Sequence, residues 1–489
     1  MSSSLSGPAP PPRGDNGAVP TRGRCDVESC RVFDPDRADR GEAARRRVPF
    51  DALADLAGSG RDPIELLRSQ DLQRIPELLP IRYGRMVSTP FAFYRGAAAV
   101  MADDLSRTPN SGLHTHLCGD AHLSNFGVFA TPERRLAFDV NDFDETYPGP
   151  FEWDVKRLVA SVEVAARVLS FGGKRRHRIA LACAAAYRET MSAQARLGNL
   201  AVWYSHVEAE QELADLRETL DAASRRSSRK LVEKSWRRDS LQALGKLTTM
   251  TDDGRRIVSR PPLLVPIEEV FETQDARALY RELSGRLAEY RETLRADHRV
   301  PFDRYAFVQA ARKVVGVGSV GTRSWILLLL GADDSDPLFL QAKEAQPSVL
   351  AQYLHGPDHP NQGQRVVEGQ RIMQAASDIF LGWQQGVGND GVRRDYYVRQ
   401  LRDAKGSATV ESMTPTGMEQ YARLCGRVLG YAHARGGDRF AIAEYLGPGT
   451  GFDEAMAAFA RSYADRTEQD RAMLAAAVEE GRIPVSTPT

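Results

Sequence analysis

The sequence predicts a chain of the α+β class with two lobes, in which a mainly helical lobe precedes a β-rich one. With 489 residues, the chain exceeds the size at which a single hydrophobic core keeps growing, so we expect two lobes or domains. Apolar residues recur at helical spacings of three and four through much of residues 46–310. Short apolar runs that are typical of strands then dominate residues 311–410.

The charges of the chain balance, since Lys plus Arg and Asp plus Glu each number 65. No overall charge therefore favours nucleic acid or an anionic membrane as a partner. The 5 cysteines do not have the spacing of a disulfide framework. No apolar run approaches the roughly 20 residues of a membrane helix, and residues 1–23 contain no signal-peptide core. We expect a cytoplasmic protein.

Residues 1–45 are rich in Pro, Gly and charged residues and contain few large apolar ones. Such a segment cannot bury enough surface to offset the entropy of ordering it, so a disordered tail is predicted. Residues 46–310 are predicted to form a mainly helical lobe. The exception is residues 113–142, where the apolar runs Phe126–Ala130 and Leu136–Val140 flank a turn-like segment and predict two strands.

Later parts of the helical lobe carry weaker signals. Residues 154–240 are rich in Ala and charged residues at helical spacing. Asp252-Asp253-Gly254 lies between two apolar runs and predicts a hairpin. A further helix is predicted around residues 274–294.

Residues 311–410 carry the strongest strand signals. The runs predicted as strands are Lys313–Val315, Ser324–Leu330, Leu338–Ala342 and Tyr396–Leu401. Helical periodicity returns in residues 411–489, at Gly417–Ala434 and again at Phe452–Glu480, with Gly436-Gly437 between them as a stop signal. We expect these last helices to pack on the helical lobe.

The segment Gly119–Asn125, with the sequence GDAHLSN, directly precedes the first predicted strand. It places Asp120 and Asn125 five residues apart, and the strand-borne Asp139 follows. Phosphoryl transfer needs a carboxylate that accepts the proton of an attacking hydroxyl, together with an amide and a second carboxylate that hold magnesium. Asp and Asn also cap turns without any catalytic role. The combination with His122 and Asp139 favours the catalytic interpretation.

This segment resembles the catalytic loop of the protein-kinase-like superfamily, and more closely the Gly-Asp-x-His-x-x-Asn loop of aminoglycoside and choline phosphotransferases. The resemblance implies that Asp120 is the catalytic base, Asn125 a metal ligand and Asp139 the main metal ligand. Asp142 and Asp144 crowd Asp139 in the sequence, so the carboxylate ligand stays open among these three.

Two residues are expected to support the loop rather than to react. The segment Gly149–Asp154 resembles the Gly-Pro-containing stretch that ends in a structural Asp in small-molecule kinases, which implies that Asp154 braces the catalytic loop. An Asp in the first turn of a helix also complements the helix dipole, with no catalytic connection. We expect His122 to pack and hydrogen-bond within the loop. Cys118 stands where the family usually has His and is expected to fill the same packing role.

The phosphate-binding lysine of a kinase is missing from its usual place, because residues 1–120 contain no lysine and the first is Lys156. A GxGxxG pattern appears much later, directly after a predicted strand, and Lys343 follows it on a further strand. The glycines of the pattern are Gly316, Gly318 and Gly321. This order resembles the glycine-rich hairpin and the strand-borne Lys of the kinase amino-terminal lobe.

We therefore predict that Lys343 binds nucleotide phosphates, with Glu368 on the following helix as its ion-pair partner. Glycines let the backbone approach phosphates closely, and an ammonium group neutralises their charge. A strand rather than a long helix follows the glycines, which disfavours a dinucleotide-binding turn, whereas a simple hairpin stays open as the structural alternative. The catalytic loop then precedes the nucleotide lobe, as in a circular permutation of the two-lobed kinase-like fold.

Nearly the whole chain after residue 45 is also similar to a bacterial family known as domain of unknown function 2252. The similarity is carried by Pro90–Gly96, Gly119–Gly127, Phe138–Glu145, Pro150–Leu158 and Ala432–Asp438. It implies a shared fold but no established substrate, so the function must be argued from the site residues.

The leading hypothesis is a phosphotransferase that uses ATP and Mg2+ to phosphorylate a hydroxyl of a small-molecule acceptor. A nucleotide-binding regulatory module would use the same pocket without turnover. A metal-dependent hydrolase would instead use an acidic cluster and would not need Lys343. The residues of this cluster are Asp139, Asp142, Asp144 and Glu145. We expect a nucleotide and a small molecule as partners, and neither nucleic acid nor a membrane.

Overall fold

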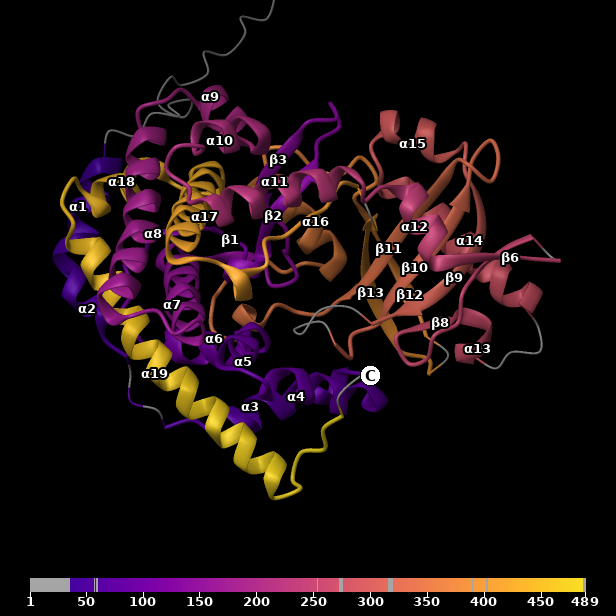
Figure 1. Cartoon of the computed structure of the whole chain (residues 1–489), viewed down its shortest axis with the longest axis horizontal. Coiled ribbons are helices and arrows are strands. Elements are labelled where there is room, and N and C mark those ends of the chain that lie inside the picture. Colours follow the sequence, from indigo (N-terminus) through magenta and orange to yellow (C-terminus); the bar gives the residue numbers. More distant parts are fainter. Residues whose placement is uncertain are drawn as a thin grey trace, which may run out of the picture.

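The computed structural model describes residues 36–486, apart from residues 57, 59, 253, 272–275, 315–319, 389 and 402. The protein is α+β, as the sequence predicts. Figure 1 shows two lobes. The mainly helical lobe contains the first and the last parts of the described chain, and the part between them forms the lobe rich in strands.

Four long helices form the centre of the helical lobe. They are α7 (Glu152–Val168), α8 (Gly173–Gln194), α17 (Pro415–Gly436) and α19 (Gly451–Glu479). α17 packs on α8, and α19 packs on both α7 and α8, so distant parts of the chain share one hydrophobic core. Close packing depends on small residues, since a Cβ at Gly426 of α17 would lie 2.3 Å from the carbonyl oxygen of Cys183 in α8.

Shorter elements surround these helices. The other α-helices of this lobe are α1 (Arg37–Arg47), α2 (Phe50–Ala54), α3 (Pro63–Ser69), α4 (Leu79–Val87), α5 (Pro90–Gly96), α6 (Ala98–Ser106), α9 (Asn199–Tyr204), α10 (Ala209–Asp215), α11 (Ala222–Trp236) and α18 (Arg439–Leu446). The short 3-10 helices are η1 (Asp71–Gln73), η2 (Pro76–Leu78), η3 (Leu123–Asn125), η4 (Val349–Gln352) and η5 (Val410–Ser412).

Two small sheets lie beside the central helices. In one, β1 (His114–Leu117) pairs with β4 (Tyr147–Pro150). In the other, β3 (Leu136–Val140) pairs with β2 (Phe126–Ala130) and β5 (Val207–Glu208). The strands β2 and β3 confirm the two predicted on either side of a turn. Residues 119–125, which we call the catalytic loop for their resemblance to the kinase-like motif, lie between β1 and β2.

An antiparallel sheet of six strands forms the β-rich lobe, in the order β12-β13-β11-β10-β9-β8. Its strands are β8 (Leu264–Pro266), β9 (Ala306–Lys313), β10 (Ser324–Leu330), β11 (Pro337–Ala345), β12 (Gly382–Val387) and β13 (Arg393–Gln400). The remaining elements of this lobe are α12 (Ser240–Leu247), β6 (Thr248–Thr251), β7 (Gly254–Ile257), α13 (Ile267–Phe271), α14 (Ala276–Thr293), α15 (Ala296–Phe302) and α16 (Gln362–Met373).

The two faces of the six-stranded sheet differ because neighbouring residues of a strand point to opposite sides. On one face, Leu327, Leu340 and Val398 belong to a buried cluster with residues of α13, α14 and α15. On the other face, Lys343 of β11 and Arg399 of β13 line a polar cavity that the helical lobe also lines. The sheet therefore separates an apolar layer from the space between the lobes.

The β-rich lobe begins earlier in the sequence than residue 311, the boundary predicted above. β8 and most of β9 precede this residue. The helices α12, α13 and α14, which the prediction assigned to the helical lobe, contact the six-stranded sheet instead. The reason is physical: an amphipathic pattern indicates that a helix covers a core, but not which core it covers.

Part of the predicted disordered tail is a helix. α1 begins at Arg37, packs on α18 and donates a hydrogen bond of 2.6 Å from Arg40 to Asp438. The two helices approach closely, since a Cβ at Gly41 would lie 2.3 Å from the carbonyl oxygen of Ala441. Ion pairs and small residues hold this helix, and neither produces the pattern of large apolar residues on which the prediction depended.

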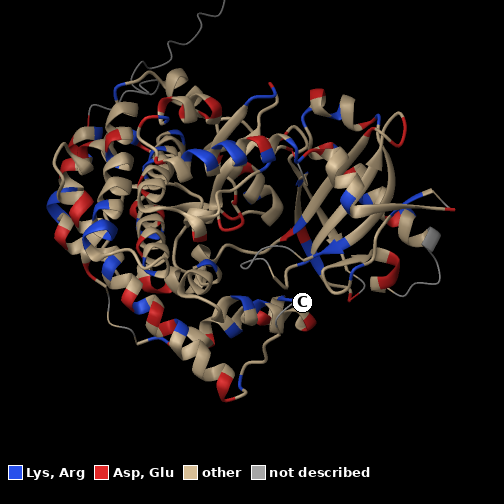
Figure 2. Cartoon of the chain, in the orientation of Figure 1, with Lys and Arg blue, Asp and Glu red and all other residues tan. Residues whose placement is uncertain are grey.

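Basic and acidic residues are interspersed along the ribbon of both lobes in Figure 2, in keeping with the balanced composition. Within the described ranges, no helix is at once long enough and apolar enough to cross a membrane.

Lys156 of α7 is buried in the helical lobe without a hydrogen-bond partner for its Nζ within the described part of the chain. The ammonium lies 4.6 Å from the centre of the Phe459 ring in α19. Burial lowers the pKa of Lys156 from 10.5 to about 8, although the charges of Glu152 and Asp55 oppose this shift. A buried charge held in this way destabilises the folded state.

We predict that Lys156→Met stabilises the protein at pH 7, by on the order of 1–3 kcal/mol. The folded state releases the lysine proton at a lower pH than the unfolded chain, so the unfavourable contribution of Lys156 shrinks as the pH rises from about 8 to 10.5. Urea unfolding of both proteins at pH 7 and pH 9.5 measures this. A stability difference that does not decrease at the higher pH would contradict the assignment.

Candidate active site

A polar cavity of about 450 Å³ lies where the two lobes meet. The helical lobe contributes side chains from the catalytic loop and from the turn after β3, and the sheet contributes two cations. Its polar and charged lining residues include Asp120, Asn125, Asp142, Asp144, Lys343 and Arg399. Residues predicted from separate motifs therefore line one space.

Backbone contacts hold the catalytic loop between β1 and β2 in place. The carboxylate of Asp154, in the first turn of α7, accepts hydrogen bonds from the backbone N–H groups of Cys118 (2.8 Å) and Gly119 (3.0 Å). The φ angle of Gly119 is +81°, and a Cβ there would lie 2.2 Å from the carbonyl oxygen of Glu145. Only glycine fits this position. Asp154 thus fixes the loop and lies outside the cavity lining.

The carboxylate of Asp120 points into the cavity and is 19% exposed. Arg157 of α7 donates a hydrogen bond of 2.8 Å from its Nε to Asp120 Oδ1, and its guanidinium lies 4.0 Å from the centre of the Tyr94 ring. Burial raises the pKa of Asp120 above its ordinary value, and the positive charge of Arg157 opposes this. Arg157 therefore orients the carboxylate that the sequence predicts to be the base.

His122 and Asn125 both bond within the loop. His122 is buried, its Nδ1 accepts a hydrogen bond from the Ser124 N–H, and burial lowers its pKa well below the ordinary value. A neutral imidazole that is bonded in this way supports the loop. The side-chain amide of Asn125 donates to the Asp120 carbonyl oxygen at 2.9 Å, which leaves its amide oxygen available in the cavity.

Lys343 lies across the cavity from residues 142–145 after β3, which we call the acidic turn. Its Nζ donates a hydrogen bond of 2.6 Å to Asp144 Oδ2, although the two residues are 199 positions apart in the sequence. The hydroxyl of Tyr397 donates to the other carboxylate oxygen at 2.6 Å. Burial alone would raise the pKa of Asp144, but the charge of Lys343 and these two hydrogen bonds lower it. Burial and the adjacent Asp144 raise the pKa of Asp142.

Asp139, predicted as the main metal ligand, does not line the cavity. It is buried on β3, where its Oδ1 accepts from the Val140 N–H at 2.8 Å and its Oδ2 lies 3.8 Å from the Arg435 guanidinium. Burial raises its pKa, and the charge of Arg435 opposes this. The strand ends one residue later, so the chain turns before Asp142 and brings that carboxylate to the cavity instead.

We predict that Asp139→Asn leaves the response to magnesium and ATP within about two-fold of the wild type. The same substitution at Asp142 should weaken that response, because Asp142 lines the cavity and Asp139 does not. Thermal unfolding with and without magnesium and ATP measures both variants. The reverse order of effects would return the ligand role to Asp139.

The predicted glycine-rich loop is described only in part, since Gly316 and Gly318 lie outside the described residues. Gly321 ends the loop with φ +91°, and its carbonyl oxygen accepts a hydrogen bond of 2.8 Å from the Ile75 N–H of the helical lobe. The turn between β9 and β10 therefore reaches the other lobe at the rim of the cavity, where Thr322 and Arg74 are lining residues.

The predicted ion pair between Lys343 and Glu368 is not formed: Glu368 of α16 accepts a hydrogen bond of 2.7 Å from Gln364, and Lys343 pairs with Asp144. α16 reaches the site through Arg365, whose guanidinium donates to the carbonyl oxygens of Asp144 (2.8 Å) and Thr146 (2.5 Å). The helix thus holds the backbone of the acidic turn. The sequence shows that the helix carries a charged residue. It does not show which face of the helix packs against the strand that carries Lys343.

Several carboxylates line the cavity, but within the described residues they are not arranged as a metal-binding cluster. Among the described residues, no group of three or more His, Cys, Asp or Glu side chains is arranged to hold a metal ion. Asp139 lies apart from Asp142 and Asp144, and the Glu145 carboxylate accepts a hydrogen bond of 2.8 Å from the Val349 N–H. Asp142, Asp144 and Glu145 line the cavity, so Asp139 is the one carboxylate of the hydrolase hypothesis that lies outside it.

The sequence matches the family described as "Uncharacterized protein conserved in bacteria (DUF2252)" over residues 74–477. The chain belongs to this family. No curated protein and no solved structure matches it. The match spans both lobes and includes the catalytic loop, the acidic turn and Lys343, so these parts of the cavity lie within the matched range.

Two arginines at the site were not singled out from the sequence: Arg157, which contacts Asp120, and Arg399, which lines the cavity. Arg157 follows Asp154 by three residues, and this spacing places both side chains on the face of α7 that points toward the loop. The spacing was therefore a signal from which Arg157 could have been predicted as a residue of the site. Arg95 of α5 lines the cavity, and its buried Nε has no hydrogen-bond partner within the described ranges. The charges of Glu411 and Asp120 raise the pKa of Arg95, but burial outweighs them and lowers it. The sequence signal for Arg95 is its place in the family segment Pro90–Gly96.

Proposed function

We propose that this protein is a phosphotransferase that uses magnesium and ATP to phosphorylate a hydroxyl of a small molecule, with a circularly permuted protein-kinase-like arrangement of its lobes. One observation carries the proposal: Asp120, Asn125 and Asp142 line the same cavity as Lys343. Lys343 lies on β11, the third strand of the meander β9-β10-β11, and the glycine-rich segment joins the first two of these strands. Kinases bring the same residue types together around a nucleotide.

Each residue of the cavity would have a distinct role in the transfer. A bond forms between the acceptor hydroxyl oxygen and the γ-phosphorus of ATP while the bond from that phosphorus to the ADP oxygen breaks. The hydroxyl proton passes to the carboxylate of Asp120, which Arg157 holds in position. Lys343 neutralises phosphate charge from the opposite side of the cavity. Its pairing with Asp144 keeps the ammonium buried and oriented.

The donor set fits magnesium, which prefers oxygen ligands and keeps several waters, so that two or three protein oxygens suffice. Asn125 and Asp142 would hold the ion, with Asp144 beside them. Bound magnesium would neutralise negative charge on the phosphate oxygens. The cavity volume of about 450 Å³ lies within the range of small-molecule sites.

Thermal unfolding with ATP and magnesium tests the proposal, combined with an assay for ADP release over a panel of hydroxyl acceptors. A ligand that binds the folded state raises the unfolding free energy, by roughly 2.7 kcal/mol at a hundred-fold excess over its Kd. We expect stabilisation by ATP that requires magnesium, and ADP release that increases with one class of acceptor. The absence of any nucleotide effect would contradict the proposal.

A regulatory module that binds ATP without turnover is the second candidate. The observation that favours it is the contact of Asp120 with Arg157, because a neighbouring guanidinium stabilises the carboxylate anion and weakens it as a base. Stabilisation by magnesium and ATP together with no ADP release for any acceptor would support this function over the first.

A further inference from the structure

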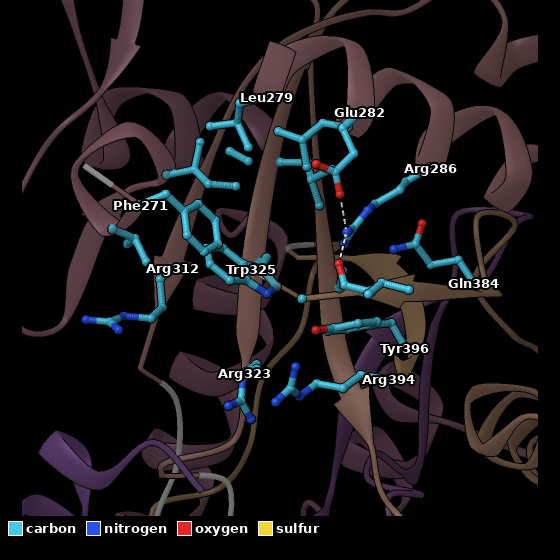
Figure 3. A pocket seen from close by; sticks show the side chains of 18 of the residues that line it. Phe271, Leu279, Glu282, Arg286, Arg312, Arg323, Trp325, Gln384, Arg394 and Tyr396 are labelled. Carbon is cyan, nitrogen blue, oxygen red and sulfur yellow. Dashed lines mark hydrogen bonds and ion pairs between the residues drawn. The ribbon is translucent and has the colours of Figure 1, made fainter. Parts of the chain in front are cut away.

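A second cavity, of about 360 Å³, lies on the opposite face of the six-stranded sheet, between β9, β10 and β13 on one side and α13 and α14 on the other. Its walls are mainly apolar, and the side chains that form most of them are Phe271, Leu279, Leu283, Leu287, Trp325 and Leu327. The Phe271 and Trp325 rings stack with centroids 5.8 Å apart. Figure 3 shows them between Leu279 and a group of arginines.

Four arginines line this cavity, and three of them have partners. Arg286 donates to Glu282, Arg394 donates to Asp390 at 2.8 Å, and Arg323 lies 3.3 Å from Glu344. Arg312 differs, because its Nε is buried and has no hydrogen-bond partner within the described part of the chain.

Arg312 stands on β9 directly opposite Trp325 of β10 in the strand register. Both side chains line the cavity. In Figure 3 Arg312, Arg323 and Arg394 lie on the same side of the two aromatic rings. The cavity thus has an apolar interior and, at one end, a guanidinium whose Nε has no hydrogen-bond partner among the described residues.

The sheet separates this cavity from the candidate active site. Ala342 of β11 lines the apolar cavity, whereas the next residue, Lys343, lines the polar one. An occupant of the apolar cavity would therefore not contact Asp120 or the acidic turn. The inference below does not depend on the proposed phosphotransferase function.

We propose that the apolar cavity binds a small amphipathic carboxylate, with its apolar body between the sheet and α14 and its carboxylate on Arg312. A volume of about 360 Å³ lined mainly by apolar and aromatic side chains is typical of small-molecule sites, in which a few polar groups set the orientation. A guanidinium presents a planar pair of donors that matches a carboxylate. An entirely apolar occupant would leave the Arg312 Nε without a partner, at a cost in free energy.

Calorimetric titration of the full chain with decanoate tests the proposal, with decanamide as a neutral analogue of the same apolar body. We expect saturable binding of decanoate with a Kd on the order of 10 µM and a negative heat-capacity change, which marks the burial of apolar surface. Decanamide should bind at least about ten-fold more weakly than decanoate, because it cannot form the charged contact with Arg312. Equal affinity for the two compounds, or no saturable binding of decanoate, would overturn the proposal.

Two variants and one control locate the site. Arg312→Gln should weaken decanoate binding about ten-fold, and Leu283→Trp should abolish it by filling the cavity. Arg304→Gln is the matched control, because Arg304 is an exposed arginine outside the cavity lining, and it should bind as the wild type does. Thermal unfolding confirms that each variant is folded. Wild-type affinity in both folded cavity variants would place decanoate elsewhere and overturn the assignment.

Discussion

Replacing Asp120 by Asn is expected to lower phosphoryl transfer by about 100- to 10,000-fold while the protein keeps its fold and its affinity for ATP. The reason is that an amide has the shape of the carboxylate but cannot accept the acceptor's proton in the transition state. Rates of ADP release at saturating ATP and acceptor measure the effect. A value of kcat that falls without a change in the Kd of ATP is the signature of a group that acts on the reacting atoms.

The control for this variant concerns Arg157, because Asp120→Asn removes the negative partner of a buried guanidinium. Arg157 keeps its hydrogen bond of 2.8 Å to the Tyr94 carbonyl oxygen and its contact with the Tyr94 ring, so we expect the variant to fold. Urea unfolding and the thermal response to magnesium and ATP verify this. Unchanged turnover in a folded Asp120→Asn protein would remove Asp120 from the role of base.

Lys343→Met is expected to lower kcat/KM for ATP by about 10- to 150-fold, which corresponds to the loss of one hydrogen bond to a charged group, about 1.5–3 kcal/mol. Methionine preserves the length and much of the volume of the side chain, so the main change is the loss of the ammonium that faces the acidic turn. Steady-state kinetics with ATP as the varied substrate measure the effect. The mechanism requires the defect to lie in nucleotide use rather than in affinity for the acceptor.

Lys343 is buried against Asp144, so its removal also leaves a carboxylate without its cation. The double variant Lys343→Met with Asp144→Asn removes both charges and should recover stability but not activity. Glu368→Gln is a matched control, since Glu368 bonds to Gln364 rather than to Lys343, and we expect its kinetics to stay within about two-fold of the wild type. A larger loss for Glu368→Gln than for Lys343→Met would reverse the assigned roles.

Local sequence signals predicted many of the elements well. Alternation and short apolar runs located β2, β3 and β10, and helical spacing located α17 and α19, because these patterns reflect side chains that face one core. α1 was missed because its contacts come from small residues and ion pairs, and the start of the β-rich lobe was misplaced because helices cover either core with the same pattern.

For the site, the sequence alone determined which residue types are available and at what spacing: the loop with Asp120 and Asn125, the acidic turn, and Lys343 on a strand after glycines. Residue types and spacings of this kind are properties of neighbouring positions in the sequence, so no tertiary structure is needed to find them. Only the tertiary structure decided which of these residues contact one another. Lys343 and Asp144, for example, are 199 positions apart in the sequence, and their contact depends on how the two lobes pack. In the folded protein Asp139 lies near Arg435, and Lys343 pairs with Asp144 rather than with Glu368. The tertiary structure also left Arg312 without a partner for its Nε, within the described ranges, beside an apolar cavity that no motif indicates.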